Sequence, residues 1–155
     1  MVPLSSIIKI VPNAQWKATP ENANQKANVL AACEKIAARG VNPFLSTVII
    51  DAGASAAFSG WAQDICPCLT RSRCGNFGYW CTSKGAHLDV HEMMMLQGLE
   101  PSAVDFKSAG VTAGQMASML GNTMSHNVLC QLLPRVLYKA KLITKIKFDC
   151  VRGSV

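Results

Sequence analysis

Four cysteines in one short stretch come nearest, by type and spacing, to a metal site. Cys66, Cys68, Cys74 and Cys81 fall within 16 residues. Thiolates bind zinc, but common structural zinc sites pair their cysteines two to four residues apart. The spacing here, C-x-C-x5-C-x6-C, lacks such pairs. We therefore favour loop cysteines without a metal and assign no metal ligand.

One of these cysteines follows a proline and is a candidate nucleophile. A thiol becomes reactive where positive charge lowers its pKa, and Arg71 and Arg73 follow Cys68 closely. No partner acid accompanies Pro67-Cys68, so no catalytic residue is assigned. Surface or capping roles are expected for the three histidines, His87, His91 and His126.

A turn after an apolar run is a candidate phosphate loop. Thr47–Ile50 is β-branched and apolar, which predicts a buried strand, and the run Asp51–Ser55 follows it directly. Loops of this kind cradle phosphates when they continue as G-x-G-x-x-G into a helix. The second and third glycines are missing here, so a plain strand-to-turn transition is favoured.

Two stretches in the C-terminal half hold the most informative residues. His91–Leu99 is apolar and ends its helical pattern at Gln97-Gly98, and Leu120–Leu129 carries Gly121-Asn122 between two helical patterns. Glycine there permits a sharp turn or a close approach to another group. A helix C-cap with glycine in the left-handed conformation is the alternative, and the asparagine would then be incidental.

The rest of the chain supplies the elements that must position these residues. Thr19-Pro20-Glu21 predicts the start of a helix that ends before Gly40. Residues 1–19 are expected to be irregular or edge structure, and residues 59–86 to form loops and short strands.

Capping pairs predict where the later helices begin. Asp89 is followed by Glu92 and Thr112 by Gln115, each at capping-box spacing. Within the first of these helices, Met93–Met95 is expected to fill the core.

The last helix is expected to open at Ser125, and Pro134 to kink or shorten it. Its apolar side would carry Val128, Leu129, Leu132, Leu133, Val136 and Leu137.

Composition excludes several classes of protein. The 155 residues fit one domain, half of them are apolar, and 15% are charged, which argues for a globular body. No apolar run approaches the roughly 18–20 residues that span a bilayer, so no membrane partner is expected. No secretory signal is evident, and seven irregularly spaced cysteines indicate reduced thiols in the cytosol or nucleus.

Positive charge accumulates toward the end of the chain. The net charge is +6, and the basic residues after Tyr138 face only Asp149. Such a balance favours contact with a polyanion, and a solvated basic face is the alternative. The residues concerned are Lys139, Lys141, Lys145, Lys147 and Arg152.

Three stretches, taken in order, resemble the C-terminal part of the DNA cytosine-5 methyltransferases. His87–Leu99 is similar to the family's penultimate motif, approximately R-x-L-T-x-x-E-x-x-x-L-Q-G-F, at Leu88, Glu92, Leu96, Gln97 and Gly98. The last motif, approximately Q-x-x-x-x-G-N-[ASTC]-[VM]-x-x-x-V-[LA], is matched at Gly121, Asn122, Thr123, Met124, Val128 and Leu129. Upstream, Pro67–Arg73 resembles P-x-[LI]-T-x-S-R.

The resemblance covers about residues 64–138 and departs from the family in places. The glutamine of the last motif, Gln115, lies one residue further away than usual. Ala86 or His87 replaces the basic residue of the penultimate motif, and Asp89 and Val90 stand at its Thr and Pro positions. Phosphate or backbone contacts are therefore in doubt.

The resemblance implies a mixed α/β fold in which short strands and loops precede a helical C-terminal part of an S-adenosylmethionine-dependent methyltransferase. Residues 1–63 would form a helix and strand region left from target recognition, 64–138 the family motifs, and 139–155 a basic tail. Gly121, Asn122 and Thr123 would lie beside the S-adenosylmethionine donor. DNA phosphate contacts fall to Thr70, Arg71, Ser72 and Arg73, and structural roles to Glu92, Gln97 and Gly98.

Several family motifs have no counterpart in these 155 residues. They are the F-x-G-x-G donor loop, the catalytic Pro-Cys-Gln, the Glu-Asn-Val and the arginine motif. We therefore expect a C-terminal fragment or subunit that needs a complementary N-terminal half to bind the donor and act on DNA. It would be nuclear in a eukaryote and otherwise cytoplasmic. A non-catalytic DNA- or protein-binding module and a truncated pseudogene product are the alternatives.

Overall fold

The computed structural model describes Ile8 and residues 20–145, and it combines helices with a small antiparallel sheet. The sheet has the strand order β2-β1-β3-β4. Its strands are β1 (Val48–Asp51), β2 (Trp61–Gln63), β3 (Tyr79–Cys81) and β4 (Ala86–His87). The mixed α/β class expected from the sequence is confirmed at this coarse level.

The predicted strand is the centre of the sheet, where β1 pairs with β2 on one side and β3 on the other. Val48, Ile49 and Ile50 are all fully buried. Alternate side chains point to opposite faces of a strand. Val48 and Ile50 join one hydrophobic cluster and Ile49 the other. A continuous apolar run is therefore explained by helices covering both faces.

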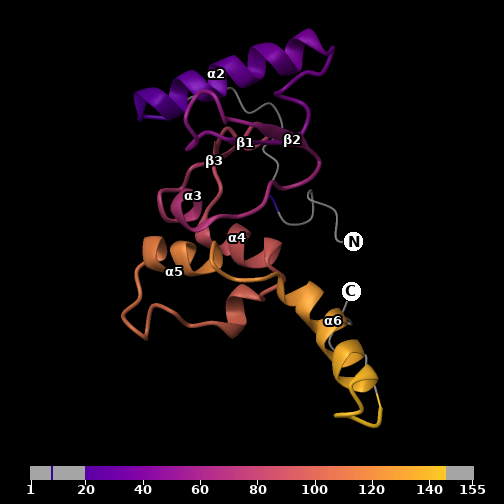
Figure 1. Ribbon diagram of the computed structural model, residues 1–155. Helices are drawn as coiled ribbons and strands as arrows, with labels where there is room; N and C mark the ends of the chain where they lie inside the picture. The colour runs from indigo at the N-terminus through magenta and orange to yellow at the C-terminus, as the bar shows by residue number, and fades with distance from the viewer. Residues whose placement is uncertain (1–7, 9–19, 146–155) are drawn as a thin grey trace.

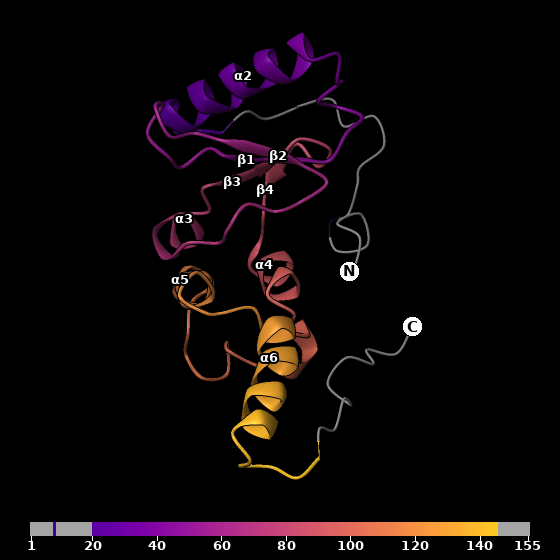
Figure 2. The same cartoon turned by 45° about the vertical axis from the view of Figure 1, so that its right-hand side comes forward.

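Helix α2 (Ala23–Ala38) covers one face of the sheet, as Figures 1 and 2 show. The predicted cap is wrong: Asn22 is the N-cap, and its side chain accepts from the N–H groups of Asn24 and Gln25. Pro20 and Glu21 therefore precede the first turn. Thr19 lies outside the described residues. An asparagine cap satisfies two amide donors that a helix leaves unpaired at its start.

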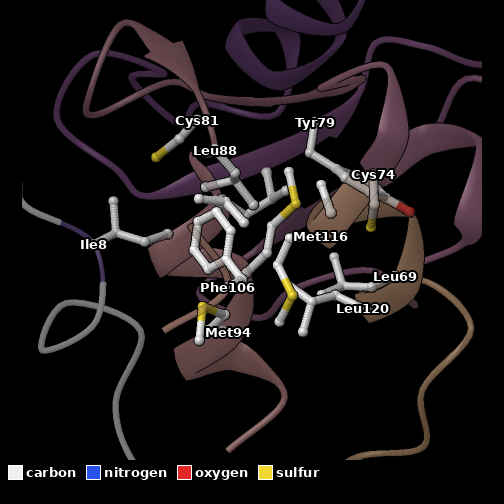
Figure 3. Packing of buried hydrophobic residues seen from close by; sticks show 14 residues of the cluster. Ile8, Leu69, Cys74, Tyr79, Cys81, Leu88, Met94, Phe106, Met116 and Leu120 are labelled. Carbon is white, nitrogen blue, oxygen red and sulfur yellow. The ribbon is translucent and has the colours of Figure 1, made fainter. Parts of the chain in front are cut away.

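The opposite face is covered by α3 (Arg71–Gly75), α4 (Val90–Leu96) and α5 (Ala113–Leu120), with the short 3-10 helix η1 (Pro101–Ala103) between the last two. The larger core cluster lies in this layer (Figure 3). It includes Met93 and Met94, which are fully buried, so the expected core role is confirmed for these two methionines.

Both predicted capping boxes are present, at Asp89 with Glu92 and at Thr112 with Gln115. The five-residue helix α3 was not expected, because residues 59–86 show no helical period. The strands predicted for that stretch are present as β2, β3 and β4.

Helix α6 (His126–Lys139) extends away from the other elements in both views (Figures 1 and 2). Ser125 is its N-cap, as predicted, although the side chain makes no capping bond. The helix continues five residues past Pro134, so the predicted shortening is wrong. None of its residues is buried. No helix among the described residues could cross a bilayer.

The predicted irregular structure of residues 1–19, apart from Ile8, lies outside the described residues, as do Lys147, Asp149 and Arg152 of the basic tail.

Candidate functional site

The two most informative stretches of the sequence meet in the structure, and Gln97 joins them. Its side-chain amide donates to the carbonyl oxygens of Leu120 at 3.0 Å and Thr123 at 3.3 Å. The backbone carbonyl of Gln97 accepts from the backbone N–H of His126 at 2.8 Å. Gln97 is buried, so these bonds are shielded from competing water. One glutamine thereby fixes the end of α5 and the start of α6 relative to α4.

Gly98 follows in the left-handed conformation, with φ +78°. A Cβ atom at this position would lie 2.6 Å from three side-chain atoms of Asn127. Its φ therefore favours glycine, and the exposed Asn127 side chain would have to move to make room for a Cβ atom. We call Gln97, Gly98 and the turn Gly121–Thr123 the junction.

Gly121 needs glycine for a different reason from the one the cap hypothesis gives. It is the C-cap of α5 with φ −69°, which any residue adopts, so the left-handed cap interpretation is wrong. A Cβ atom here would collide with backbone atoms of Thr70 and Arg71. The missing side chain lets the junction turn lie directly against the start of α3, across about 50 residues of sequence.

The two polar residues of the turn are exposed. The side chain of Asn122 makes no hydrogen bond with any described residue, so its amide is available to a ligand as donor and acceptor. The Thr123 hydroxyl donates to the carbonyl of Met119 at 2.8 Å and keeps its acceptor lone pairs. These groups suit polar atoms of a small molecule, and Gly121 contributes backbone only.

The segment expected to contact phosphate begins beside this turn. Thr70, Arg71 and Ser72 are exposed at the start of α3. The Tyr79 hydroxyl holds the segment in place: it accepts from the Thr70 N–H at 3.1 Å and donates to the Cys68 carbonyl at 2.7 Å. Burial raises the pKa of this hydroxyl, which stays protonated as that donor role requires. Sequence reasoning missed Tyr79.

Arg73, the fourth phosphate candidate, is occupied within the protein. Its guanidinium Nε donates to the Asp51 carboxylate at 3.1 Å, in a pair about three-quarters buried. Burial raises the pKa of Asp51, and the charge of Arg73 opposes that shift. The structure thus separates the candidates: Thr70, Arg71 and Ser72 face solvent, and Arg73 braces the end of β1.

The turn Asp51–Ser55 begins at the last residue of β1 and is tied to neighbouring elements. Gly53 lies against Gly78, and the N–H of Gly53 donates to the carbonyl of Gly78 at 2.8 Å. The buried Asn28 amide donates to the carbonyls of Ala52 and Ala54 at 2.9 and 2.8 Å, tying the turn to α2.

Glu92 has the structural role expected of it. Its carboxylate accepts from the Asp89 N–H at 2.8 Å, closing the capping box, and from Lys84 Nζ at 2.7 Å. The Lys84 ammonium also donates to the His87 carbonyl at 3.1 Å. A carboxylate this buried needs such a partner, and Lys84 is a residue that sequence reasoning missed.

Three of the four cysteines in the stretch 66–81 are buried or partly buried. Burial raises the pKa of Cys66 to about 12 and that of Cys74 to about 11. Cys68 is exposed, and Arg73, one of the two arginines that follow it in sequence, pairs with Asp51. Within the described residues, no three cysteine, histidine or acidic side chains are placed to hold a metal ion.

One histidine differs from its predicted surface or capping role. His87 is half-buried, and its ring meets the edge of Trp80 with the centroids 4.9 Å apart. Burial lowers its pKa, and the nearby charge of Lys84 acts in the same direction. His91 and His126 are exposed.

Comparison of the chain with protein-family models, curated proteins and solved structures finds no match. The candidate site therefore rests on its own geometry.

Proposed function

We propose that this chain provides the C-terminal part of a DNA (cytosine-5) methyltransferase. It would contribute contacts to DNA and one wall of the S-adenosylmethionine pocket. It would not catalyse methyl transfer alone, because the motifs for cytosine attack and donor binding are not among its residues. The single observation that supports the proposal most is the junction.

Three stretches that resemble the family's motifs converge on that one place. Gln97, from the penultimate motif, donates to the backbone on both sides of the Gly121–Thr123 turn of the last motif. Gly121 lies against Thr70 and Arg71, from the upstream stretch. Three unrelated stretches would not be required to contact one another in the fold. Their contact therefore supports the proposal that they descend from one ancestral site.

In the family, a cysteine thiolate attacks C6 of a flipped cytosine, and S-adenosylmethionine supplies the methyl group for C5. For this chain, Asn122 and Thr123 would hold polar atoms of the donor, and Gln97 would keep their turn in position. Arg71 would contact a DNA phosphate from the start of α3, which positions a protein without reading sequence.

Helix α6 supports the need for a complementary half. Large apolar side chains cover one side of it and are 37–54% exposed. We propose that the other half of the enzyme covers this face. These side chains are Val128, Leu132, Leu133, Val136 and Leu137.

The test is reconstitution with an N-terminal half that carries the four missing motifs. Methyl transfer from labelled S-adenosylmethionine to a cytosine-containing duplex is expected only when both halves are mixed. Asn122→Ala should weaken donor binding by the complex roughly tenfold, because a hydrogen bond to a polar or charged group is lost. Gln63→Ala, an exposed amide at the end of β2, is the matched control and should leave donor binding unchanged.

A complex that binds no S-adenosylmethionine would contradict the proposal. Duplex binding that weakens steeply with salt, without any donor affinity, would instead identify a non-catalytic DNA-binding module.

A further inference from the structure

A cleft of about 890 Å³ lies on the side of the molecule where α2 begins. The first turn of α2, the turn after β1, the end of α3 and the β3–β4 hairpin enclose it. Its volume is in the range of small-molecule sites. Four amide side chains line it: Asn22, Asn24, Gln25 and Asn76.

Among the described residues, the lining is polar and includes no arginine or lysine. Besides the amides it includes the hydroxyls of Ser55 and Ser72, the carboxylate of Glu21 and the half-buried His87. Amides donate and accept hydrogen bonds side by side, which matches the edges of nucleobases. A phosphate would find hydrogen-bond donors among these side chains but no arginine or lysine to balance its charge.

The walls of the cleft are held before any ligand arrives. The Asn28 amide ties the turn after β1 to α2, and Asn22 caps that helix. Asn22 is therefore committed to the fold, whereas Asn24 and Gln25 lack any such side-chain bond to the described residues. These two amides are available to a ligand.

A second cleft of about 460 Å³ adjoins the first and shares Ser72 and Asn76 with it. It is lined also by Thr70 and Arg71. Arg71 is exposed and forms no ion pair with a described residue, unlike Arg73. An arginine beside a hydroxyl suits a phosphate group. The first cleft thus offers amides that suit a nucleobase, and the second offers an arginine that suits a phosphate. Helix α3 lies between them.

We propose that the two clefts together bind a nucleotide, with its base against Asn24 and Gln25 and its phosphate at Arg71. The nucleotide is either free or one unit of a nucleic acid strand. This inference goes beyond the proposed function. The clefts share Thr70, Arg71 and Ser72 with its DNA contacts, but they share no residue with Gln97 or the Gly121–Thr123 turn.

The test titrates the full chain with each of the four deoxynucleoside 5′-monophosphates, with 2-deoxyribose 5-phosphate, and with a short single-stranded oligonucleotide. Saturable binding of monophosphates identifies a free-nucleotide site, and binding of the oligonucleotide alone identifies a site for a unit of a strand. No binding of either would overturn the proposal. Equal affinity for the base-free sugar phosphate would also overturn it, since the amide cleft would then be empty.

Variants divide the two halves of the site. Arg71→Ala should weaken binding roughly tenfold for every base, as loss of a charge-assisted phosphate contact does. The pair Asn24→Ala and Gln25→Ala should instead remove preference among bases by a similar factor. Asn24 and Arg71 are exposed and Gln25 is partly buried. Lys107→Ala and Gln131→Ala are exposed controls that should bind like the wild type.

Loss of binding in the controls as well would overturn the assignment. Asn122→Ala should leave nucleotide binding unchanged, so failure of this proposal and failure of the methyltransferase proposal are distinguishable.

Discussion

Single residues at the junction are constrained by close backbone packing. Gly121 has an ordinary helical φ, and a side chain there would strike the backbone where α3 begins. The neighbouring Asn122 has no such packing role. The glycine is therefore explained by the fold alone, and the asparagine is the residue on which a ligand-binding role depends.

Replacing Gly121 with alanine is expected to destabilise the protein by about 2 kcal/mol, because an added methyl group must push two backbone segments apart. Urea unfolding measures the change. Gly60→Ala is the control, since nothing lies within 4 Å of a Cβ atom built there. Equal stability of the two variants would show that α5 does not approach α3 so closely.

His87 should make stability depend on pH. Its folded pKa lies below the ordinary value of 6.5, so the unfolded chain takes up the proton first as the pH falls. The free energy of unfolding should therefore decrease as pH drops below about 6.5, and His87→Phe should remove that part of the decrease. Urea titrations from pH 7.5 to 5 measure it. The exposed His91, replaced by glutamine, should leave the pH dependence as in the wild type.

At the scale of elements, α4 and α5 are held inside the fold and α6 is not. The capping boxes begin α4 and α5 at residues that spacing alone identifies. Helix α6 is amphipathic, yet its apolar side meets solvent along its length. Under the proposed function, this face is the surface that the N-terminal half would cover.

Charging that face should cost the isolated chain little. Leu132→Lys with Val136→Lys is expected to change the free energy of unfolding by less than about 0.5 kcal/mol, because neither side chain is buried. The same pair should abolish reconstitution with the N-terminal half, measured as lost methyl transfer. Leu120→Ala in the core should lower the free energy of unfolding by about 3 kcal/mol, and it serves as the positive control for the unfolding assay. A large loss of stability in the lysine variant would mean that α6 packs on its own chain.

Across the part of the chain that the structure describes, buried apolar residues form two clusters, one on each face of the sheet. The larger one joins residues from α3, α4 and α5 to β1 and β3 (Figure 3). Cys74 and Cys81 are fully buried in it. Their thiols are therefore reporters of global unfolding.

Thiol labelling at pH 8 should separate these cysteines from the exposed one. Cys68 should be alkylated rapidly in the native protein, whereas Cys74, whose pKa is about 11, should react only as urea unfolds the chain. Mass spectrometry of peptides measures both rates. Rapid native labelling of Cys74 would show that the α3 layer opens locally, at a lower free energy than global unfolding.

The sequence alone determined the local features: the strand at Thr47–Ile50, the capping boxes, and the start of α6 at Ser125. Each depends on residues within a few positions of one another, so the chain specifies it before any packing. The five-residue α3 escaped prediction because one turn shows no period. The Asn22 cap was missed because Thr19-Pro20-Glu21 offers the same signal three residues earlier.

Only the tertiary structure decided the roles of the site residues. No local pattern distinguishes Arg71 from Arg73. In the fold, Arg73 pairs with Asp51, which lies 22 positions away in the sequence. Gly121 meets Thr70, and Gln97 meets Thr123, across similarly long separations. Such contacts form when helices and sheet bury their apolar faces together, and no local pattern encodes the side chains that this packing brings into contact.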